Sequence, residues 1–172
     1  RGILYILLSI AVSLQFIAPV AYASMPDDKP KLEIPDSLRA TYRYTDALKA
    51  LVIHNDTTKG LPLLREALEI DSAYAPAHYE LASYYLDSDL KRAVVHARKA
   101  YEQDTTSRWY MGLYGQALAI AGEVQQALPV YRKLIVEDKN NPDHYRILAL
   151  LYQQNKQPYS AIATLDSAEV RF

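Results

Sequence analysis

The side chains that could carry acid–base, nucleophilic or metal chemistry are few in this chain of 172 residues. It contains no cysteine, and its four histidines are widely spaced: His54, His78, His96 and His144. The sequence has no H-E-x-x-H pair, no G-x-S-x-G nucleophile turn and no P-loop. We therefore predict a protein that is not an enzyme, with no catalytic residue, no metal site and no cofactor.

Carboxylates are plentiful, but three of them recur at one structural position. Asp71, Asp104 and Asp138 each come four residues after the last apolar position of a helical pattern. Such recurrence favours a role at helix ends over a catalytic one. His78 falls at an apolar packing position, which predicts a buried structural histidine rather than a ligand.

The elements that position these residues can be inferred from "HYRILALLYQQNKQPYSAIATLDSA", which begins at His144. Two apolar stripes with helical spacing flank a polar turn that contains Pro158. The first stripe is Tyr145, Leu148, Ala149 and Tyr152, and the second is Ala161, Leu165 and Ala168. The segment therefore predicts two helices joined by a short turn.

The same pair of stripes occurs three more times, at separations of 34 or 33 residues. The copies are Met111, Tyr114, Gly115 and Leu118 with Ala127, Tyr131 and Leu134; His78, Leu81, Ala82 and Tyr85 with Ala93, Ala97 and Ala100; and Tyr44, Ala47, Leu48 and Leu51 with Gly60, Leu64 and Ala67. One such hairpin cannot bury both of its apolar faces, whereas stacked copies can.

This helix–turn–helix period resembles the tetratricopeptide repeat (TPR) family. Its small-residue position is filled by Ala82, Gly115 and Ala149, and alanine opens the second helix in three copies. The resemblance implies an all-α, right-handed α-solenoid of about four TPR units, at about 41–74, 75–107, 108–141 and 142–172, the last incomplete. The alternative is an ordinary four-helix bundle, which does not require small residues at a fixed period. Proline inside the second helix, at Pro62 and Pro129, departs from the pattern.

The amino terminus has the order of a secretory signal peptide. A positive charge precedes an apolar run and the sequence "AYA", which predicts cleavage between Ala23 and Ser24. The run is short for a membrane span, although an uncleaved membrane anchor is the alternative. We expect a signal peptide at 1–23, a linker at 24–36 and the TPR domain at 37–172, with Asp36 or Ser37 capping the first helix. The mature protein would be periplasmic or secreted.

In TPR proteins the first helix of each repeat lines a concave groove. By resemblance, the partner-binding residues here are Tyr42, Thr45, Lys49, Tyr79, Ser83, Trp109, Gln116 and Arg146. Aromatic side chains with scattered polar groups suit the binding of a peptide. The basic clamp by which some TPR domains hold carboxylate tails is absent, because only Lys49 and Arg146 carry charge at those positions.

The overall charge narrows the class of partner. Removal of residues 1–23 takes away Arg1 alone, which leaves 18 basic and 20 acidic residues and no basic stripe for nucleic acid. The sequence predicts an exported, non-catalytic scaffold that binds a protein or an extended peptide and does not stay in the membrane after cleavage. The alternative is the extracytoplasmic sensor portion of a larger signalling protein or enzyme, with its effector domain beyond Phe172. The oligomeric state is left open.

Overall fold

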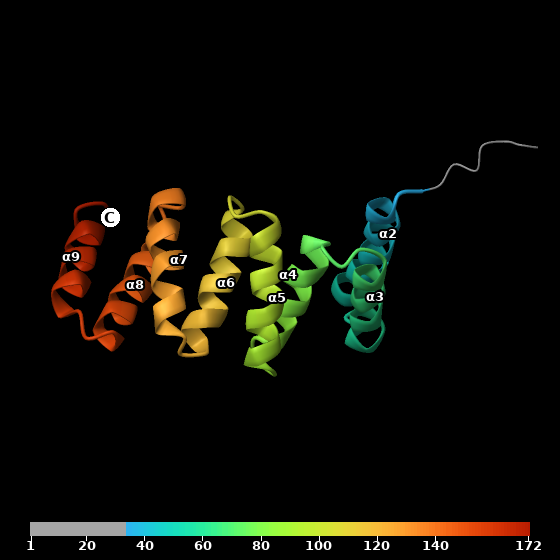
Figure 1. The fold of residues 1–172 in the computed structure, drawn as a ribbon, viewed down its shortest axis with the longest axis horizontal. Helices are drawn as coiled ribbons and strands as arrows, with labels where there is room; N and C mark the ends of the chain where they lie inside the picture. The colour runs from blue at the N-terminus through green and yellow to red at the C-terminus, as the bar shows by residue number, and fades with distance from the viewer. Residues whose placement is uncertain (1–33) are drawn as a thin grey trace, which may run out of the picture. The chain divides into compact units, whose positions relative to one another are not determined.

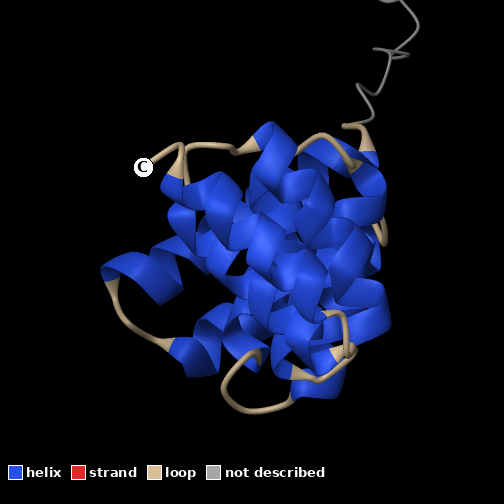
Figure 2. Ribbon diagram, turned by 90° about the vertical axis from the view of Figure 1, so that its left-hand side faces the viewer, coloured by secondary structure: helices blue, strands red, loops and turns tan. Residues whose placement is uncertain are grey.

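The computed structural model describes residues 34–172, and Pro35–Phe172 form one compact unit (Figure 1). Within these residues the chain is helical and has no strand (Figure 2). The elements are α2 (Asp36–Leu48), the π-helical turn η1 (Lys49–Ile53), α3 (Thr57–Ile70), α4 (Ala75–Tyr85), α5 (Leu90–Gln103), α6 (Arg108–Ile120), α7 (Val124–Glu137), α8 (Pro142–Gln154) and α9 (Pro158–Glu169).

The helices pack in consecutive antiparallel pairs, and each pair packs on the next. Within the unit, α2 lies on α3, α4 on α5, α6 on α7 and α8 on α9, while α3, α5 and α7 contact the first helix of the following pair (Figure 1). The predicted fold class, an α-solenoid of about four helix–turn–helix units, is confirmed.

The predicted stripes form the core. In the second and third units every predicted stripe residue is buried, and Met111, Leu118, Tyr131 and Leu134 are among the largest enclosed side chains. In the outer units Tyr44, Leu48, Leu51 and Ala168 are half-buried, and Leu165 is 45% exposed. Its counterparts on α3, α5 and α7 are covered by the next helix pair, whereas α9 packs within the described residues mainly on α8.

The recurring aspartates are helix-end residues, as predicted. The Asp71 carboxylate accepts a hydrogen bond from the Ala73 amide, and that of Asp104 accepts one from the Thr106 amide. The hydroxyl and backbone amide of Thr106 keep the pKa of Asp104 below its ordinary value. Asp138 instead bonds His144, at 3.0 Å from Oδ2 to Nε2.

The start of α2 differs from its prediction. Pro35 occupies the N-cap position without a side-chain hydrogen bond, so neither Asp36 nor Ser37 caps the helix. Asp36 lies one residue inside α2, where its carboxylate pairs with Arg39 at 2.7 Å.

The turns inside the helix pairs also follow the repeat. Asn55, Gly122 and Lys156 have positive φ, at 50°, 73° and 57°, and lie at the same distance before the second stripe of their units. Glycine adopts this conformation without strain, but lysine does not. The turn of the second unit is one residue shorter and has no such residue among those described.

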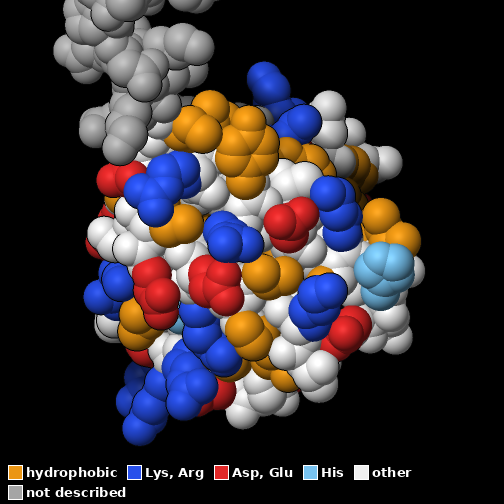
Figure 3. All heavy atoms as spheres, turned by 90° about the vertical axis from the view of Figure 1, so that its right-hand side faces the viewer, with side chains coloured by type: hydrophobic (Ala, Val, Ile, Leu, Met, Phe, Trp, Pro, Cys, Tyr) orange, Lys and Arg blue, Asp and Glu red, His pale blue; other side chains and the backbone are white. Residues whose placement is uncertain are grey.

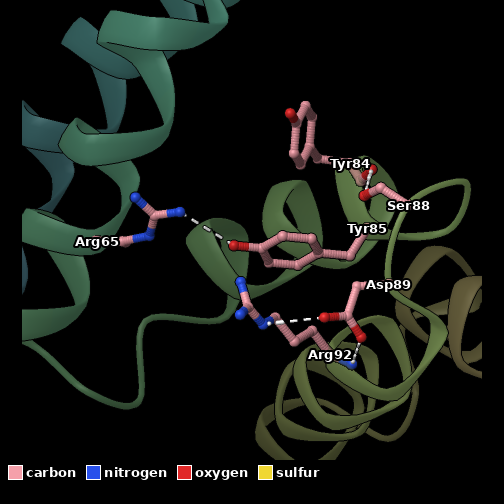
Figure 4. Close-up of polar contacts among 6 residues, drawn as sticks. All are labelled: Arg65, Tyr84, Tyr85, Ser88, Asp89 and Arg92. Atoms are coloured by element: carbon pink, nitrogen blue, oxygen red, sulfur yellow. Dashed lines mark hydrogen bonds and ion pairs between the residues drawn. The ribbon is translucent and has the colours of Figure 1, made fainter.

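A hydrogen bond between arginine and tyrosine joins successive helix pairs. The Arg65 guanidinium donates to the Tyr85 hydroxyl at 3.1 Å (Figure 4), and Arg132 donates to Tyr152 at 2.8 Å. At the interface between α5 and α6, Arg98 donates to the Tyr114 hydroxyl at 3.2 Å. Tyr114 lies one helical turn before the position on α6 that corresponds to Tyr85 and Tyr152. These three arginines recur at the repeat period, which was the overlooked signal in the sequence.

Arg98 contacts two other helices. Its guanidinium contacts Tyr114 and also donates to Gln126 Oε1 at 3.1 Å, so one side chain connects α5, α6 and α7.

Candidate functional site

The first helices of the units present an exposed surface with large aromatic side chains. Trp109, near the start of α6, is 68% exposed, and Tyr42 on α2 is 58% exposed. Aromatic side chains of this size can bury a large apolar area against a partner. Trp109 also borders a cavity, so the surface around it is the candidate binding site.

A cavity of about 570 Å³ opens beside Trp109. Its lining comes mainly from α6 and α8, with Tyr79 contributed by α4 and Tyr131 by α7. The Tyr79 ring packs against Tyr110 with centroids 5.7 Å apart, and the Arg108 guanidinium lies 5.7 Å from the Trp109 ring. The cavity thus has aromatic walls with a cation held at one edge.

A second cavity of about 300 Å³ adjoins the first. The two share Gln116, Tyr131 and Ile147, and the second is otherwise lined largely by apolar side chains of α6 and α8. Together they form a continuous trough between these helices, which we call the α6–α8 trough. Its two parts differ in chemistry, because the first has polar groups at its rim and the second suits an aliphatic side chain.

The floor of the trough includes a buried tyrosine, Tyr131. Tyr131 is almost fully buried, and burial raises the pKa of its hydroxyl to about 12. The His144 ring packs edge-on against Tyr131, with centroids 6.1 Å apart, and its Nε2 lies 3.0 Å from Asp138 Oδ2. Tyr131 of α7 and His144 of α8 thus pack against each other beneath the larger cavity.

The structure gathers only some of the residues predicted for the groove. Tyr79, Trp109 and Gln116 line the cavity beside Trp109. Arg146 is exposed and pairs with Asp143 at 2.9 Å. The remaining predicted residues lie on α2, η1 and α4 and do not line the trough: Tyr42, Thr45, Lys49 and Ser83. The predicted cleavage site, Ala23 and Ser24, lies outside the described residues.

Two of these non-lining residues make polar contacts with residues three or four positions earlier in the chain. The Thr45 hydroxyl donates to the Thr41 carbonyl at 2.8 Å, and Lys49 Nζ lies 3.3 Å from Asp46. On the end of the unit formed by α2 and α3, basic and acidic side chains are interspersed (Figure 3), and Arg43 lies 3.5 Å from Glu66. No single sign of charge dominates that face.

Sequence reasoning missed one repeat position that lines the trough. Leu113 on α6 and Ile147 on α8 occupy the same position in successive units, and both line the larger cavity. The counterpart on α4 is Glu80. The groove positions carried over from the TPR pattern did not include this one, although an apolar residue beside a groove position was a usable signal.

The histidines proved less isolated than their spacing indicated. His78 is buried, as predicted, but its Nδ1 lies 2.8 Å from Nδ1 of His96. His78 Nε2 lies 3.0 Å from the Ser72 carbonyl. Burial lowers the pKa of both rings, that of His96 to about 4. Across residues 34–172, no group of three or more His, Cys, Asp or Glu side chains is placed to hold a metal ion.

None of the helices between residues 34 and 172 is both long enough and apolar enough to cross a bilayer.

Comparison with known proteins supports the fold. No family model and no curated protein matches the chain. Among solved structures, the chain is similar to MamA AMB-1, a TPR-like protein, with a TM-score of 0.68, 18% identity, and coverage of 81% of this chain and 76% of that one. A mutant MamA structure matches with a TM-score of 0.63 and 15% identity, covering 78% of this chain and 98% of that one. At this identity the likeness shows a TPR-type fold.

Proposed function

We propose that this protein is an exported, non-catalytic scaffold that holds another protein, or an extended peptide segment of one, in the α6–α8 trough. The observation that carries the proposal is the trough itself, with Trp109 at its rim and Tyr79 and Gln116 on its walls. Its similarity to a TPR-like fold supports a role in protein binding over one in catalysis.

The chemistry of the trough favours a peptide over a nucleic acid. Backbone amides of an extended segment can bond Gln116, while an aliphatic side chain fills the cavity lined by Ile147, Leu150 and Leu151. Lys and Arg are not concentrated along the trough, since Arg108 is the one such residue in its lining. A phosphate backbone would find few counterions there.

The experiment begins with peptides selected from a random display library on the full chain. Trp109 is the only tryptophan in the protein, so its fluorescence reports directly on occupancy of the trough. We expect a selected peptide to shift the Trp109 emission to shorter wavelength as water leaves the ring. Tyr79→Ala and Trp109→Ala should each weaken binding by at least about 1–2 kcal/mol in titration calorimetry.

The matched control is Tyr159→Ala. Tyr159 is an aromatic residue of α9 that is 87% exposed and lies outside the trough. Its removal should leave the affinity unchanged, and circular dichroism should show native helicity in all three variants. Unchanged affinity in both trough variants would remove the trough as the binding site.

Export is proposed from the sequence of residues 1–23 alone. Amino-terminal sequencing of the protein recovered from the periplasm or medium should begin at Ser24. Recovery of residues 1–23 intact in the membrane fraction would make that segment an anchor and overturn the proposal of a cleaved signal.

A further inference from the structure

Another cavity, of about 350 Å³, lies between α3, α4 and α5. None of its lining residues also lines the α6–α8 trough, so the two are separate places on the molecule. Its volume falls at the lower end of the range of small-molecule pockets, which is about 300–1,000 Å³. The cavity therefore has room for a small ligand and not for a folded partner.

Two guanidinium groups converge on one phenol in this cavity. Arg65 of α3 donates to the Tyr85 hydroxyl of α4 at 3.1 Å, and Arg92 Cζ of α5 lies 5.3 Å from the centroid of the Tyr85 ring. Both groups lie on the hydroxyl side of that ring (Figure 4). The hydrogen bond from Arg65, with a smaller effect of Arg92, lowers the pKa of the Tyr85 hydroxyl, as two cations near one oxygen should.

The hydrogen-bond donors of the cavity are only partly used. None of the ion pairs found among residues 34–172 includes Arg65. The Tyr85 hydroxyl accepts from Arg65, and its own proton has no acceptor among those described residues. Arg92 pairs with Asp89 through Nε at 3.1 Å, which leaves its two terminal nitrogens able to donate. Three side chains from three helices can therefore donate to one ligand.

The fourth unit shows which part of this arrangement belongs to the repeat. A cavity of about 310 Å³ lies there at the corresponding place, with Tyr152 as the counterpart of Tyr85. The bond from Arg132 to Tyr152 is retained, so one arginine on the phenol is a general contact between successive helix pairs. Ser160 stands in place of Arg92. The second guanidinium group is thus an addition that the packing of the repeat does not require.

Phosphate is the anion that suits this set of donors. A carboxylate presents two oxygens in one plane, and a single guanidinium fork can satisfy both. Here the donors approach from three helices, and the phosphate of a monoester offers three acceptor oxygens and a charge near −2. Two arginines match that charge, and their planar forks match the spacing of phosphate oxygens.

We propose that Arg65, Tyr85 and Arg92 bind the phosphate group of a small phosphate monoester in the cavity between α3, α4 and α5. The two guanidinium groups offset the charge of the ligand, and the Tyr85 hydroxyl donates its proton to a phosphate oxygen. His96 stacks on the Tyr85 ring with centroids 5.8 Å apart and forms the adjoining wall. The site goes beyond the proposed function and does not depend on the trough.

The direct test is a titration of the full chain with glycerol 3-phosphate at constant ionic strength, while the ring signals of Tyr85 and His96 are followed by NMR. Glycerol and sodium acetate are titrated in the same way. We expect saturable shifts with the phosphate ester, none with glycerol and much weaker binding of acetate. Absence of any shift would overturn the site, and equal binding of acetate would overturn its assignment to phosphate.

A phospholipid headgroup carries the same chemistry, so vesicles form the second arm of the test. Phosphatidylcholine vesicles are compared with and without phosphatidic acid by co-sedimentation of the full chain. We expect no binding that depends on phosphatidic acid. Binding to phosphatidic acid without binding of glycerol 3-phosphate would overturn the soluble ligand and assign the phosphate to a lipid.

The repeat supplies a substitution that removes the site and keeps the fold. Arg92→Ser installs the residue of the fourth unit, and Asp89 still caps α5 because it accepts from the backbone amide of that position at 3.1 Å. Affinity for glycerol 3-phosphate should fall at least about tenfold. The matched control is Lys91→Ser, which removes one positive charge from an exposed neighbour outside the cavity. Equal losses in the two variants would reduce the effect to general charge attraction and overturn the site.

Two further variants test the chemistry of the cavity. Tyr85→Phe keeps the ring and removes the hydroxyl, so it should weaken binding of the phosphate ester while circular dichroism shows native helicity. Glu69 is the acidic residue of the lining and is exposed. Because its charge repels a bound anion, Glu69→Gln should strengthen binding. Unchanged affinity in both variants would show that the phosphate is not held between these side chains.

Discussion

The second and third helix pairs share one backbone pattern but fill it with different chemistry. Three positions that are polar in the second pair are apolar in the third: His78 against Met111, Glu80 against Leu113, and His96 against Val130. The third pair buries its three residues in an apolar core, whereas the second holds a histidine pair and a half-buried carboxylate.

This difference shows what the repeat does and does not determine. Small residues and stripe spacing set how the helices approach one another, so the pairs stack in the same way. The remaining positions can then exchange an aliphatic contact for a hydrogen bond without loss of the fold. Buried polar groups cost free energy unless they are paired, so the second pair should be the more sensitive to pH and to loss of a single partner.

The largest effect is expected from overpacking the third pair. A Cβ added at Gly115 would lie 3.1 Å from both Tyr131 Cε2 and Val130 Cγ1, which is tighter than ordinary contact. Gly115→Leu should therefore lower the free energy of unfolding by about 3 kcal/mol in urea denaturation. Ala82→Leu, at the same position of the second pair, should cost less because a Cβ is already accommodated there.

The control for this comparison is Lys156→Leu, in an exposed turn. It should change stability by no more than about 0.5 kcal/mol. Equal losses for Gly115→Leu and Lys156→Leu would contradict the close approach of α6 to α7 described above.

Acid should destabilise the second pair selectively. Burial lowers the pKa of His78 and His96, so folding favours the neutral rings. Stability from this source is complete above the unfolded pKa of about 6.5 and is lost as pH falls toward the value of about 4 for folded His96. We expect a loss of about 2–3 kcal/mol across that window, measured by urea unfolding at successive pH values.

The geometry explains why the pair resists two protons. His78 Nε2–H donates to the Ser72 carbonyl, so neutral His78 accepts at Nδ1 from His96. Protonation of both rings would set two N–H groups against each other in the presence of nearby Lys99, Arg65 and Arg92. A flat stability profile between pH 6.5 and 4 would show that the pair does not titrate in this way.

Substituting the residues of the third pair into the second sharpens the comparison. His96→Val alone removes the donor to His78 Nδ1 and should cost about 1–2 kcal/mol, because a buried acceptor is left unpaired. His78→Met together with His96→Val makes the site apolar and should restore the stability at pH 7.5. The double variant should also lack the acid-dependent loss, which separates the histidines from carboxylates that titrate nearby. Additive losses in the double variant would contradict the pairing.

What could be predicted from the sequence follows the same division between positions that recur in every repeat and positions that differ. The 34-residue period was sufficient to predict the helix pairs, because Ala82, Gly115 and the alanines of the second helices recur with it. It could not predict that His78 meets His96. Such contacts depend on how each helix is rotated against a non-identical neighbour. The trough was only partly predicted, since Trp109 and Tyr79 were identified but Ile147 was not.

The smallest expected loss of stability comes from the interface between the second and third helix pairs. Arg98 of α5 donates to the Tyr114 hydroxyl of α6 and to Gln126 of α7, so it spans the boundary of the second and third pairs. Arg98→Ala should lower stability by about 1 kcal/mol, the usual net contribution of hydrogen bonds of this kind. Arg65→Ala, which removes one bond to Tyr85, should cost less. The bond itself is measured by combining Arg98→Ala with Tyr114→Phe in urea unfolding, because residues in contact show losses that do not add. If the two losses add within error, Arg98 contributes nothing through Tyr114, and the polar link between the second and third pairs would have to be assigned to Gln126 alone.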